Sequence, residues 1–380
     1  MRIDPISGEP FPRSAHPFRR LTVVGAGAYG TALAHVAAQD GTEVNLWSRS
    51  KEVAEHINRV SRNSHYLSDV VLAPSIRATH TLKDALRDAD AVLLVVPSAA
   101  IRSVARAMRA DIPPGIPIAV CAKGIEAETG FLMSQIIEDE LPGHPVGALS
   151  GPTFAAELAA GHPSAATLAF PFDQSDRLDP ENSAAARMAV TLASPAFRTY
   201  LSDDLVGVEI GGAVKNIIAI ACGMMQGAGF AENTRAALIT RGLDEMKALA
   251  EALGGRRETV TGLSGIGDLT LTCSSTTSRN MSLGVQLGSG LDRAACFEGK
   301  PIVVEGEANA KSVTDLARRL SVSMPICETV RGILNDRLPI AETFARFWAE
   351  PIESEPRAMS LTFAHPTPVA RPSEFKEIST

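Results

Sequence analysis

The sequence is poor in cysteine. Its 380 residues include five cysteines, and no two of them stand in a C-x-x-C pair. An odd number of thiols without such a pair is typical of a reducing, cytosolic setting, so we predict neither a disulfide framework nor a metal site. The first twenty residues also lack the apolar segment of a secretory signal, and no signal peptide is predicted.

Positive charge is also in short supply. Lysine and arginine number 36 against 43 aspartates and glutamates, which gives a net charge of −7. A nucleic-acid-binding surface needs a basic excess, so this composition excludes one, although a local basic patch could still bind a small anion. Hydrophobic residues make up 45% of the chain and charged residues 21%, which is typical of a soluble globular protein with a real core.

Long apolar runs are scarce, and the longest lies at residues 211–229 (GGAVKNIIAIACGMMQGAG). It is long enough to cross a membrane and contains a G-x-x-x-G pair. Because Lys215, Asn216 and Gln226 interrupt it and glycine dilutes its hydrophobicity, we predict no membrane span. An ammonium among Val, Ile and Ala costs free energy unless Lys215 reaches water or finds a partner.

What is present is an alternation of short apolar runs and helical patterns over residues 20–204. Strands are predicted in RLTVVGAG, EVNLWSR, ADAVLLVVP, GIPIAVCAKG and PVGALSGP. This rhythm predicts an α/β fold, with a Rossmann-like, doubly wound parallel sheet and helices on both faces. Residues 205–345 show helical periodicity and predict a mainly α-helical C-terminal domain. Residues 1–19 and 346–380 are rich in proline without a period, and we predict disordered extensions there.

The segment VVGAGAYG indicates a dinucleotide site. Gly25, Gly27 and Gly30 form G-x-G-x-x-G directly after a predicted strand and at the start of a predicted helix. The first glycine permits the tight turn, the second lets the backbone approach a pyrophosphate, and the third lets helix and strand pack closely. The helix N-terminus then offers free N–H groups to the phosphates. Glycines that only form a turn are the alternative.

The end of the second predicted strand bears on which dinucleotide binds. An acidic residue there would accept the ribose 2′-OH of NAD, whereas an arginine accommodates the 2′-phosphate of NADP. The chain reads NLWSRS, with Arg49 and no acid. We therefore predict NADP(H), with NAD(H) also possible, against the alternative of a solvated surface arginine.

A second set of polar residues follows the predicted strands or stands in glycine- and serine-rich turns. It comprises Lys123, Gly151, Thr153, Asp268, Ser278, Arg279 and Asn280. Ligands of open α/β sheets bind at the carboxyl ends of the strands, and Ser, Arg and Asn together suit a phosphate. Taken one at a time, each has an ordinary alternative: a solvated lysine, a helix cap, a turn residue or an exposed arginine.

Taken together, these segments make the chain resemble the bacterial type of NAD(P)-dependent glycerol-3-phosphate dehydrogenase over residues 20–345. The resemblance rests on GAGAYGTALA, CAKGI, LSGPTFAAELAAG, GGAVKNIIAIACG, NTRAALITRG, LSGIGDLTLTCSSTTSRN and VVEG, in that order. It implies interconversion of dihydroxyacetone phosphate and sn-glycerol 3-phosphate by hydride transfer. It also implies a cytoplasmic enzyme of phospholipid synthesis that forms a homodimer.

The resemblance also implies site residues. Lys215 corresponds to the proton acceptor for glycerol 3-phosphate oxidation, with Asp268 as its expected partner and Lys123 orienting the substrate oxygens. Substrate binding is implied for Lys123, Gly151, Thr153, Lys215, Asp268, Ser278, Arg279 and Asn280. Cofactor binding is implied for Gly25, Gly27, Ala28, Tyr29, Gly30, Arg49, Lys123, Ala155, Arg279, Val303 and Glu305.

The chain departs from the family pattern at a few positions. Ala28 stands where many members have serine, although a backbone contact there would survive. Gln226 and Ala231 replace an acid and a glycine, which puts the local loop geometry in doubt. We further expect the glycines beside Lys215 to leave room for a substrate. Two alternatives stay open: another two-domain 2-/3-hydroxyacid or ketopantoate-type reductase, and a non-enzymatic NADP-binding sensor.

Overall fold

The structure is a computed structural model that describes residues 14–39, 41–350, 352–353 and 362–364. Its contacts divide the chain into two compact units, which are described separately below. Unit 1 contains Met1–Ala122 and Met133–Leu205, and unit 2 contains Lys123–Leu132 and Val206–Thr380. The segment Lys123–Leu132 therefore packs with the second unit, although the predicted boundary at residue 205 had left it in the first domain.

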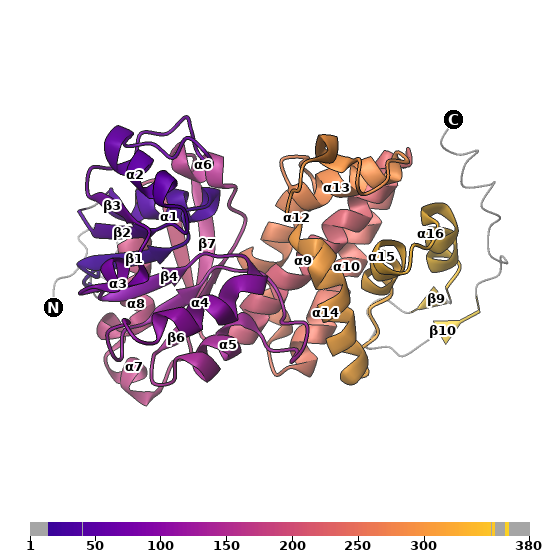
Figure 1. Ribbon diagram of the computed structural model, residues 1–380. Coiled ribbons are helices and arrows are strands. Elements are labelled where there is room, and N and C mark those ends of the chain that lie inside the picture. Colours follow the sequence, from indigo (N-terminus) through magenta and orange to yellow (C-terminus); the bar gives the residue numbers. More distant parts are fainter. Residues whose placement is uncertain (1–13, 40, 351, 354–361, 365–380) are drawn as a thin grey trace, which may run out of the picture. The chain divides into compact units, whose positions relative to one another are not determined.

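Unit 1 is built on an eight-stranded sheet in the order β3-β2-β1-β4-β5-β6-β7-β8 (Figure 1). The strands are β1 (Arg20–Val24), β2 (Glu43–Trp47), β3 (Ile76–Thr79), β4 (Ala91–Leu94), β5 (Ile118–Val120), β6 (Val146–Ser150), β7 (Ser164–Ala169) and β8 (Phe197–Ser202). The first six follow the doubly wound 3-2-1-4-5-6 order of dinucleotide-binding sheets. The predicted α/β fold is confirmed.

The sequence analysis predicted a parallel sheet. The observed sheet is mixed, because β7 runs antiparallel to β6. The connection between them carries only the short helix α6 (Ala155–Ala159). A five-residue helix rises about 8 Å, which is less than the roughly 17 Å length of a five-residue strand. The chain therefore does not return to the other end of the sheet, and β7 begins beside the carboxyl end of β6.

Helices cover both faces of the sheet. Those of unit 1 are α1 (Ala28–Ala38), α2 (Lys51–Val60), α3 (Leu82–Leu86), α4 (Ile101–Met108), α5 (Met133–Glu140), α6, α7 (Gln174–Leu178) and α8 (Ala184–Leu192). Apolar residues of α1, α2, α6 and α8 form one core with the sheet, and those of α3, α4 and α5 form another. The central strands β1 and β4 thus bury both faces, as their near-continuous aliphatic runs predict.

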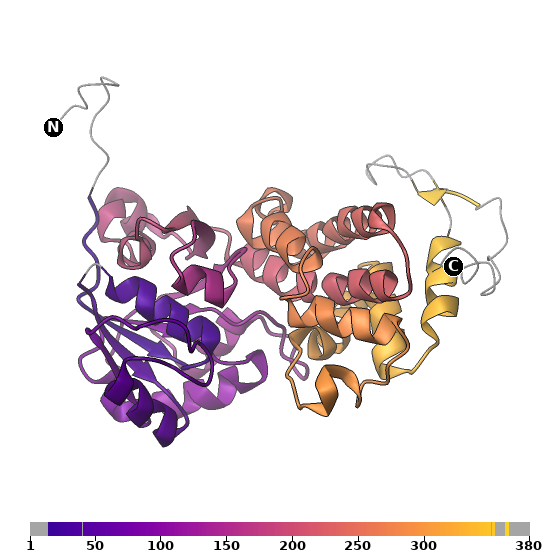
Figure 2. The ribbon, with the colours of Figure 1, turned by 90° about the horizontal axis from the view of Figure 1, so that it is seen from above.

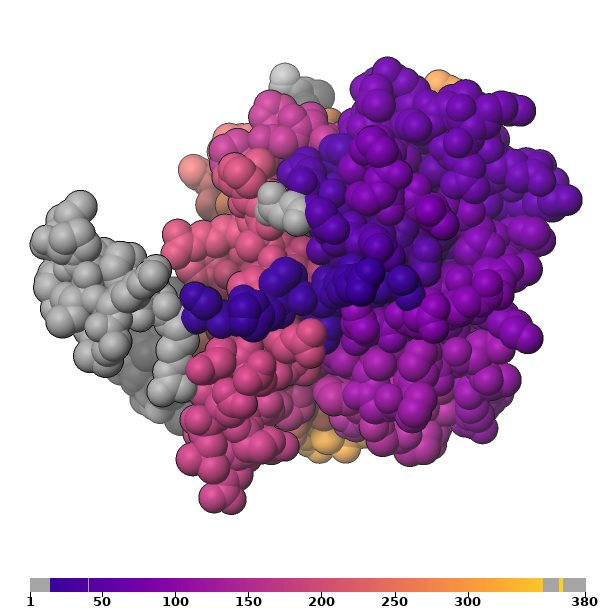
Figure 3. Space-filling view, turned by 90° about the vertical axis from the view of Figure 1, so that its left-hand side faces the viewer, coloured from indigo at the N-terminus to yellow at the C-terminus, as the bar shows by residue number. Residues whose placement is uncertain are grey.

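The start of the described chain packs against unit 1. Figure 3 shows this indigo segment running across the face of the unit beside residues coloured pink. Phe18 is 3% exposed, its N–H donates to Thr191 Oγ1 at 2.8 Å, and the Arg187 guanidinium lies over its ring. The predicted N-terminal disorder is therefore wrong for residues 14–19, and its remainder, residues 1–13, lies outside the described residues.

Unit 2 is mainly helical, and its pink to orange helices pack directly on one another (Figure 2). Its helices are α9 (Leu205–Gly227), α10 (Glu232–Ala252), α11 (Arg257–Val260), α12 (Asp268–Cys273), α13 (Arg279–Gly288), α14 (Glu305–Arg319), α15 (Pro325–Asn335) and α16 (Ile340–Trp348), and the strands β9 (Ile352–Glu353) and β10 (Thr362–Phe363) form a small antiparallel pair. Helix α16 extends past the predicted boundary at 345. Most of the tail predicted to be disordered, residues 346–380, lies outside the described residues.

Helix α9 forms the centre of unit 2. By length and composition it could cross a membrane, but 94% of its apolar window is buried inside the protein. Its G-x-x-x-G pair lies against a second one in α13: a Cβ added to Gly223 would come 2.8 Å from Gly284 Cα. Gly211 similarly packs on Ser264 and Gly265. Gly211 and Gly223 therefore allow backbones to approach closely, and for these two glycines our expectation that they leave room for a substrate is wrong.

Candidate active site

A buried ion pair joins α9 to α12. Lys215, on α9, is 7% exposed, and its Nζ donates to Asp268 Oδ1 at 2.8 Å. Asp268 is 2% exposed and opens α12 directly after a π-helical turn, Leu263–Gly267. The expected pairing of these two residues is thus present. Lys215 does not reach solvent, because a carboxylate compensates its charge inside the core.

A second lysine binds the same carboxylate. Lys123 follows the strand β5, and its Nζ donates to Asp268 Oδ2 at 2.5 Å. Each carboxylate oxygen of Asp268 therefore accepts from a different ammonium group. Taken by themselves, two ammonium groups on one carboxylate carry a net positive charge, which suits a negatively charged or polarised ligand atom.

Burial and the neighbouring charges shift the proton affinities of this cluster. Burial lowers the pKa of Lys215; the Asp268 carboxylate opposes that fall, and Lys123 adds to it. Burial would raise the pKa of Asp268, but the charges of Lys123 and Lys215 outweigh this and hold it below its usual value. The carboxylate is thus kept ionised, while Lys215 becomes a better proton donor than an ordinary lysine.

Thr272 belongs to the same cluster, and our reading of the sequence did not find it. Lys215 Nζ donates to Thr272 Oγ1 at 2.7 Å, and this hydroxyl lies 3.2 Å from Asp268 Oδ1. Residues four apart share one face of a helix. The spacing of Asp268 and Thr272 in DLTLT was therefore a usable signal. An ammonium has three N–H groups, so these two bonds leave one N–H of Lys215 for a ligand.

The predicted phosphate-binding residues lie at the start of α13 and have different surroundings. Ser278 is the N-cap of that helix, and its Oγ accepts from Met281 N at 3.3 Å. Asn280 is buried: its Nδ2 donates to Asn216 Oδ1 at 2.8 Å, and its Oδ1 accepts from Gly306 N at 2.9 Å. Arg279 is exposed. Ser278 and Asn280 therefore already have partners within the protein, whereas the Arg279 side chain is exposed.

The predicted residues near the start of α14 also contact this network. Glu305 opens α14, and its Oε2 lies 3.4 Å from the amide nitrogen of Asn216. Burial raises the pKa of Glu305, while the charges of Lys123, Lys215 and Arg279 oppose the rise. Val303 is 60% exposed just before the helix. Asn216 thus links Asn280 to Glu305, and the sequence had marked it only as an interruption of an apolar run.

The glycine loop of unit 1 has the geometry that its pattern predicts. Gly25 has φ +126°, and a Cβ there would collide with the Val95 carbonyl, while a Cβ on Gly30 would collide with the carbonyl of Gly25. A Cβ on Gly27 would meet nothing within 4 Å. Gly27 is the N-cap of α1, which begins at Ala28. The first and third glycines serve close packing, and the second faces open space, as a pyrophosphate contact requires.

The other predicted residues of unit 1 lie after the ends of strands or in the first turn of a helix. Thr153 Oγ1 donates to the Tyr29 hydroxyl at 3.0 Å, and Ala155 opens α6. A Cβ on Gly151 would lie 2.7 Å from Ala166 Cα, so this glycine is required for packing against β7. Arg49 is exposed beside the N-cap of α2.

The predicted residues thus fall into two groups, one in each unit. Unit 2 brings Lys123, Lys215 and Asp268 into direct contact. Unit 2 also holds Ser278, Arg279, Asn280, Val303 and Glu305, and unit 1 holds Gly25, Gly27, Ala28, Tyr29, Gly30, Arg49, Gly151, Thr153 and Ala155. Among the described residues, no group of three or more His, Cys, Asp or Glu side chains could hold a metal ion.

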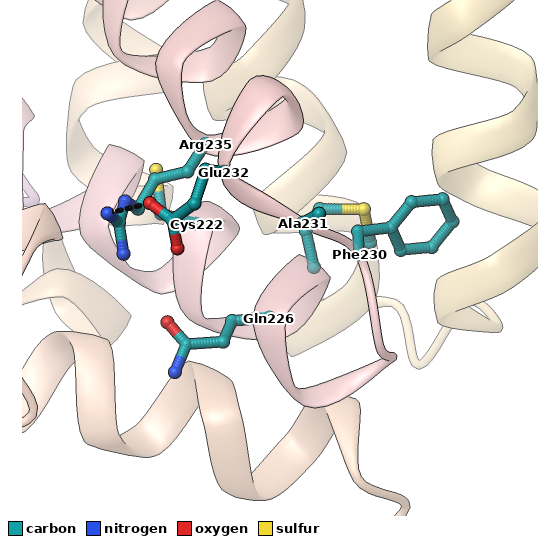
Figure 4. Close-up of a pocket in the computed structure, with 7 residues that line it drawn as sticks. Cys222, Gln226, Phe230, Ala231, Glu232 and Arg235 are labelled. Carbon is teal, nitrogen blue, oxygen red and sulfur yellow. Dashed lines mark hydrogen bonds and ion pairs between the residues drawn. The ribbon is translucent and has the colours of Figure 1, made fainter. Parts of the chain in front are cut away.

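The two departures, Gln226 and Ala231, line a small polar pocket between the end of α9 and the start of α10 (Figure 4). Glu232 and Arg235 form an ion pair across it, drawn as a dashed line in Figure 4. Its volume of about 10 Å³ suits roughly one water molecule. The pocket is too small for a phosphorylated three-carbon compound, so the departures do not bear on a substrate site there.

Both halves of the chain match one family. Residues 20–176 match the N-terminal part of NAD-dependent glycerol-3-phosphate dehydrogenase, and residues 204–345 match its C-terminal part. A glycerol-3-phosphate dehydrogenase (NAD(P)+) of Hyphomonas neptunium is 44% identical over 338 residues, which is 89% of this chain and 98% of that relative. One of Rhodospirillum rubrum is 43% identical over 91% of this chain and 96% of its own length.

Solved structures agree with the sequence relatives. The crystal structure of glycerol-3-phosphate dehydrogenase from Coxiella burnetii has a TM-score of 0.81 and 36% identity, and the match covers 87% of this chain and 99% of that one. A ketopantoate reductase from Ralstonia eutropha reaches a TM-score of 0.53 with 17% identity, covering 83% and 97% of the two chains, and shares the fold alone. The chain belongs to the NAD-dependent glycerol-3-phosphate dehydrogenase family.

Proposed function

We propose that the chain interconverts dihydroxyacetone phosphate and sn-glycerol 3-phosphate with NADP(H) or NAD(H). One observation carries the proposal: the buried Asp268 carboxylate binds the ammonium groups of both Lys215 and Lys123. A non-enzymatic dinucleotide sensor has no need of a paired lysine whose proton affinity is lowered by burial. We further propose a cytoplasmic homodimer that supplies glycerol 3-phosphate for phospholipid synthesis, as in the family that the sequence resembles.

Lys215 is the proposed proton donor for ketone reduction. The cofactor, when bound, supplies a hydride to C2 of the substrate. The C2 oxygen then gains negative charge and needs a proton, and the third N–H of the Lys215 ammonium is the proposed source. The reverse reaction uses the neutral amine as base. Asp268 and Thr272 orient the ammonium through the bonds described above, and Lys123 adds a second positive charge beside the substrate oxygens.

The residues of the glycine loop fit a dinucleotide. The open side of Gly27 and the positive end of the α1 helix dipole suit the pyrophosphate. Arg49, which is exposed beside the start of α2, is the proposed contact for a 2′-phosphate. A direct test of the function compares the oxidation of NADPH and NADH with dihydroxyacetone phosphate as substrate. Reduction of ketopantoate in place of dihydroxyacetone phosphate would overturn the proposal. So would the absence of turnover with both compounds.

Arg279 is the proposed phosphate contact. It is exposed at the first position of α13, where free backbone N–H groups and the helix dipole also attract an anion. We expect Arg279→Ala to raise the KM for dihydroxyacetone phosphate by about 10- to 100-fold and to change kcat much less, because a charge-assisted bond to the phosphate is lost. Steady-state kinetics at saturating NADPH measures both.

Arg257 offers a matched control, since it also stands at the first position of a helix in unit 2, where it pairs with Glu251. Arg257→Ala should leave the KM for the substrate within twofold. If the wild-type enzyme reduced unphosphorylated dihydroxyacetone as efficiently as the phosphate ester, there would be no phosphate grip for Arg279 to supply.

Arg49 is the proposed determinant of cofactor preference. We expect Arg49→Ala to lower kcat/KM for NADPH by about tenfold while kcat/KM for NADH changes less than twofold, because only NADPH carries the 2′-phosphate. The two values are measured in parallel with dihydroxyacetone phosphate saturating. Arg59→Ala, at the other end of α2, is the control. An equal loss with both cofactors would assign Arg49 a role unrelated to the 2′-phosphate.

A further inference from the structure

A buried asparagine outside the glycine motif binds the glycine loop. Asn63 lies beyond the end of α2 and is 1% exposed. Its Nδ2 donates to the carbonyl of Ala26 at 2.9 Å and to Thr31 Oγ1 at 2.8 Å. Ala26 stands between the first two glycines of the motif, and its carbonyl belongs to no strand or helix. Asn63 therefore supplies the donor that this buried carbonyl needs.

The bond to Ala26 also determines where the next N–H points. The Ala26 carbonyl and the Gly27 N–H belong to one planar, trans peptide unit, so they point in opposite directions. When Asn63 holds the carbonyl toward the core, the Gly27 N–H is turned away from it. Gly27 is the glycine whose side is open, and its carbonyl accepts from Thr31 N at 2.9 Å. The amide of Asn63 thus orients an N–H toward the space where a pyrophosphate would lie.

The backbone around Asn63 is itself firmly held. The Asn63 carbonyl accepts from Tyr66 N and Leu67 N, and the neighbouring Ser61 carbonyl accepts from Leu72 N. Leu67 and Leu72 are buried in the core of unit 1. The asparagine side chain is therefore presented to the glycine loop from a rigid support, which a positioning residue requires.

The other end of the amide contributes nothing to stability. Asn63 Oδ1 is buried and has no hydrogen-bond partner among the described residues. An unpaired buried acceptor is unfavourable, and an apolar side chain of similar size would avoid it. The advantage of asparagine here lies in its two N–H donors, and both of them go to the glycine motif and α1.

We infer that Asn63 is a positioning residue for dinucleotide binding, which holds the Ala26–Gly27 peptide with its N–H directed at the pyrophosphate. The pyrophosphate is common to NADP(H) and NAD(H), so the effect of Asn63 is the same for both cofactors. This distinguishes it from Arg49, which is proposed to act on NADP(H) alone. The inference rests on dinucleotide binding by unit 1 and not on the roles proposed for Lys215 or Asp268.

The test removes the N–H donors of the Asn63 side chain while keeping the shape of that side chain. Asn63→Asp removes the N–H groups and places a carboxylate oxygen against the Ala26 carbonyl. We expect the Kd of NADPH and the Kd of NADH, measured by titration without substrate, each to rise at least tenfold with their ratio unchanged. In the assay the KM for either cofactor should rise at least tenfold while kcat falls less than threefold. If Asn63→Asp does not fold, Asn63→Ala carries the same comparison without the added charge.

Asn58 provides the control. It stands on α2, and its amide makes two hydrogen bonds to the backbone of Ala78, at 2.8 and 2.9 Å, without contacting the glycine loop. Asn58→Asp should leave both Kd values within twofold. Equal weakening by the Asn58 and Asn63 variants, or unchanged Kd in Asn63→Asp, would overturn the inference. Failure of the wild-type chain to bind either dinucleotide would overturn both the inference and the proposed cofactor.

Discussion

Lys215→Ala is expected to bind NADPH with normal affinity and to lose at least about 10³-fold in kcat for dihydroxyacetone phosphate. General acid catalysis by a positioned side chain contributes about 10²–10⁴-fold, and loss of the positive charge beside the developing oxyanion adds to this. Stopped-flow or steady-state oxidation of NADPH measures the loss, and titration with NADPH measures the affinity.

A second variant separates the missing proton from a damaged core. Lys215→Met fills nearly the same volume in α9 without a charge, so it should fold at least as well and be equally inactive. Lys247→Ala, on the half-buried face of α10, is the control and should keep near-normal turnover. More than a tenth of wild-type activity in both Lys215 variants would remove this lysine from the mechanism.

Asp268→Asn is expected to lower kcat by about 10²–10³-fold at neutral pH and to change the pH dependence of ketone reduction. The Asp268 carboxylate raises the pKa of Lys215 against the effect of burial. Without it, the pKa of Lys215 falls further, and a smaller fraction of the lysine carries a proton at neutral pH. Since reduction requires the protonated form, the alkaline limb of the kcat profile should move to lower pH, and activity should partly recover on acidification.

Asp315 is a closely matched control. Its carboxylate also lies between two cations, with Lys311 Nζ at 2.8 Å and Arg331 Nη1 at 2.5 Å, and it belongs to the same unit. Asp315→Asn should leave the pH profile of kcat unshifted. A profile that is unshifted in Asp268→Asn as well would mean that the carboxylate does not tune the proton donor.

Much of the sheet could be predicted because central parallel strands are buried on both faces. The runs LTVV and AVLLVV are near-continuously aliphatic, and β1 and β4 form there. The strands β3, β7 and β8 escaped prediction. Their sequences, IRAT, SAATLA and FRTYLS, mix polar and small residues, and their place in the sheet depends on pairing with a neighbour. Pairing is a non-local property that a single strand sequence does not encode.

The site was only partly predictable for the same reason. The motif order pointed to Lys215, Asp268 and Lys123, and both lysines do bind Asp268. The phosphate contacts expected of Ser278, Arg279 and Asn280 remain a prediction, and the sequence did not show that two of these side chains also bond within the protein. Whether an asparagine or serine side chain is free to bind a ligand depends on its hydrogen-bond partners, and those of Asn280 are Asn216 and Gly306, far from it in the sequence.

The sequence by itself determined the fold class, the glycine loop and the residue types of the cluster, because local patterns of apolar residues and glycines carry that information. Only the tertiary structure decided that one carboxylate binds both lysines, that Thr272 completes their environment, and that Asn63 supports the glycine loop. The reason is physical: the cost of burying a charge or a carbonyl is met by whichever donor or acceptor the folded chain brings beside it, whatever its position in the sequence.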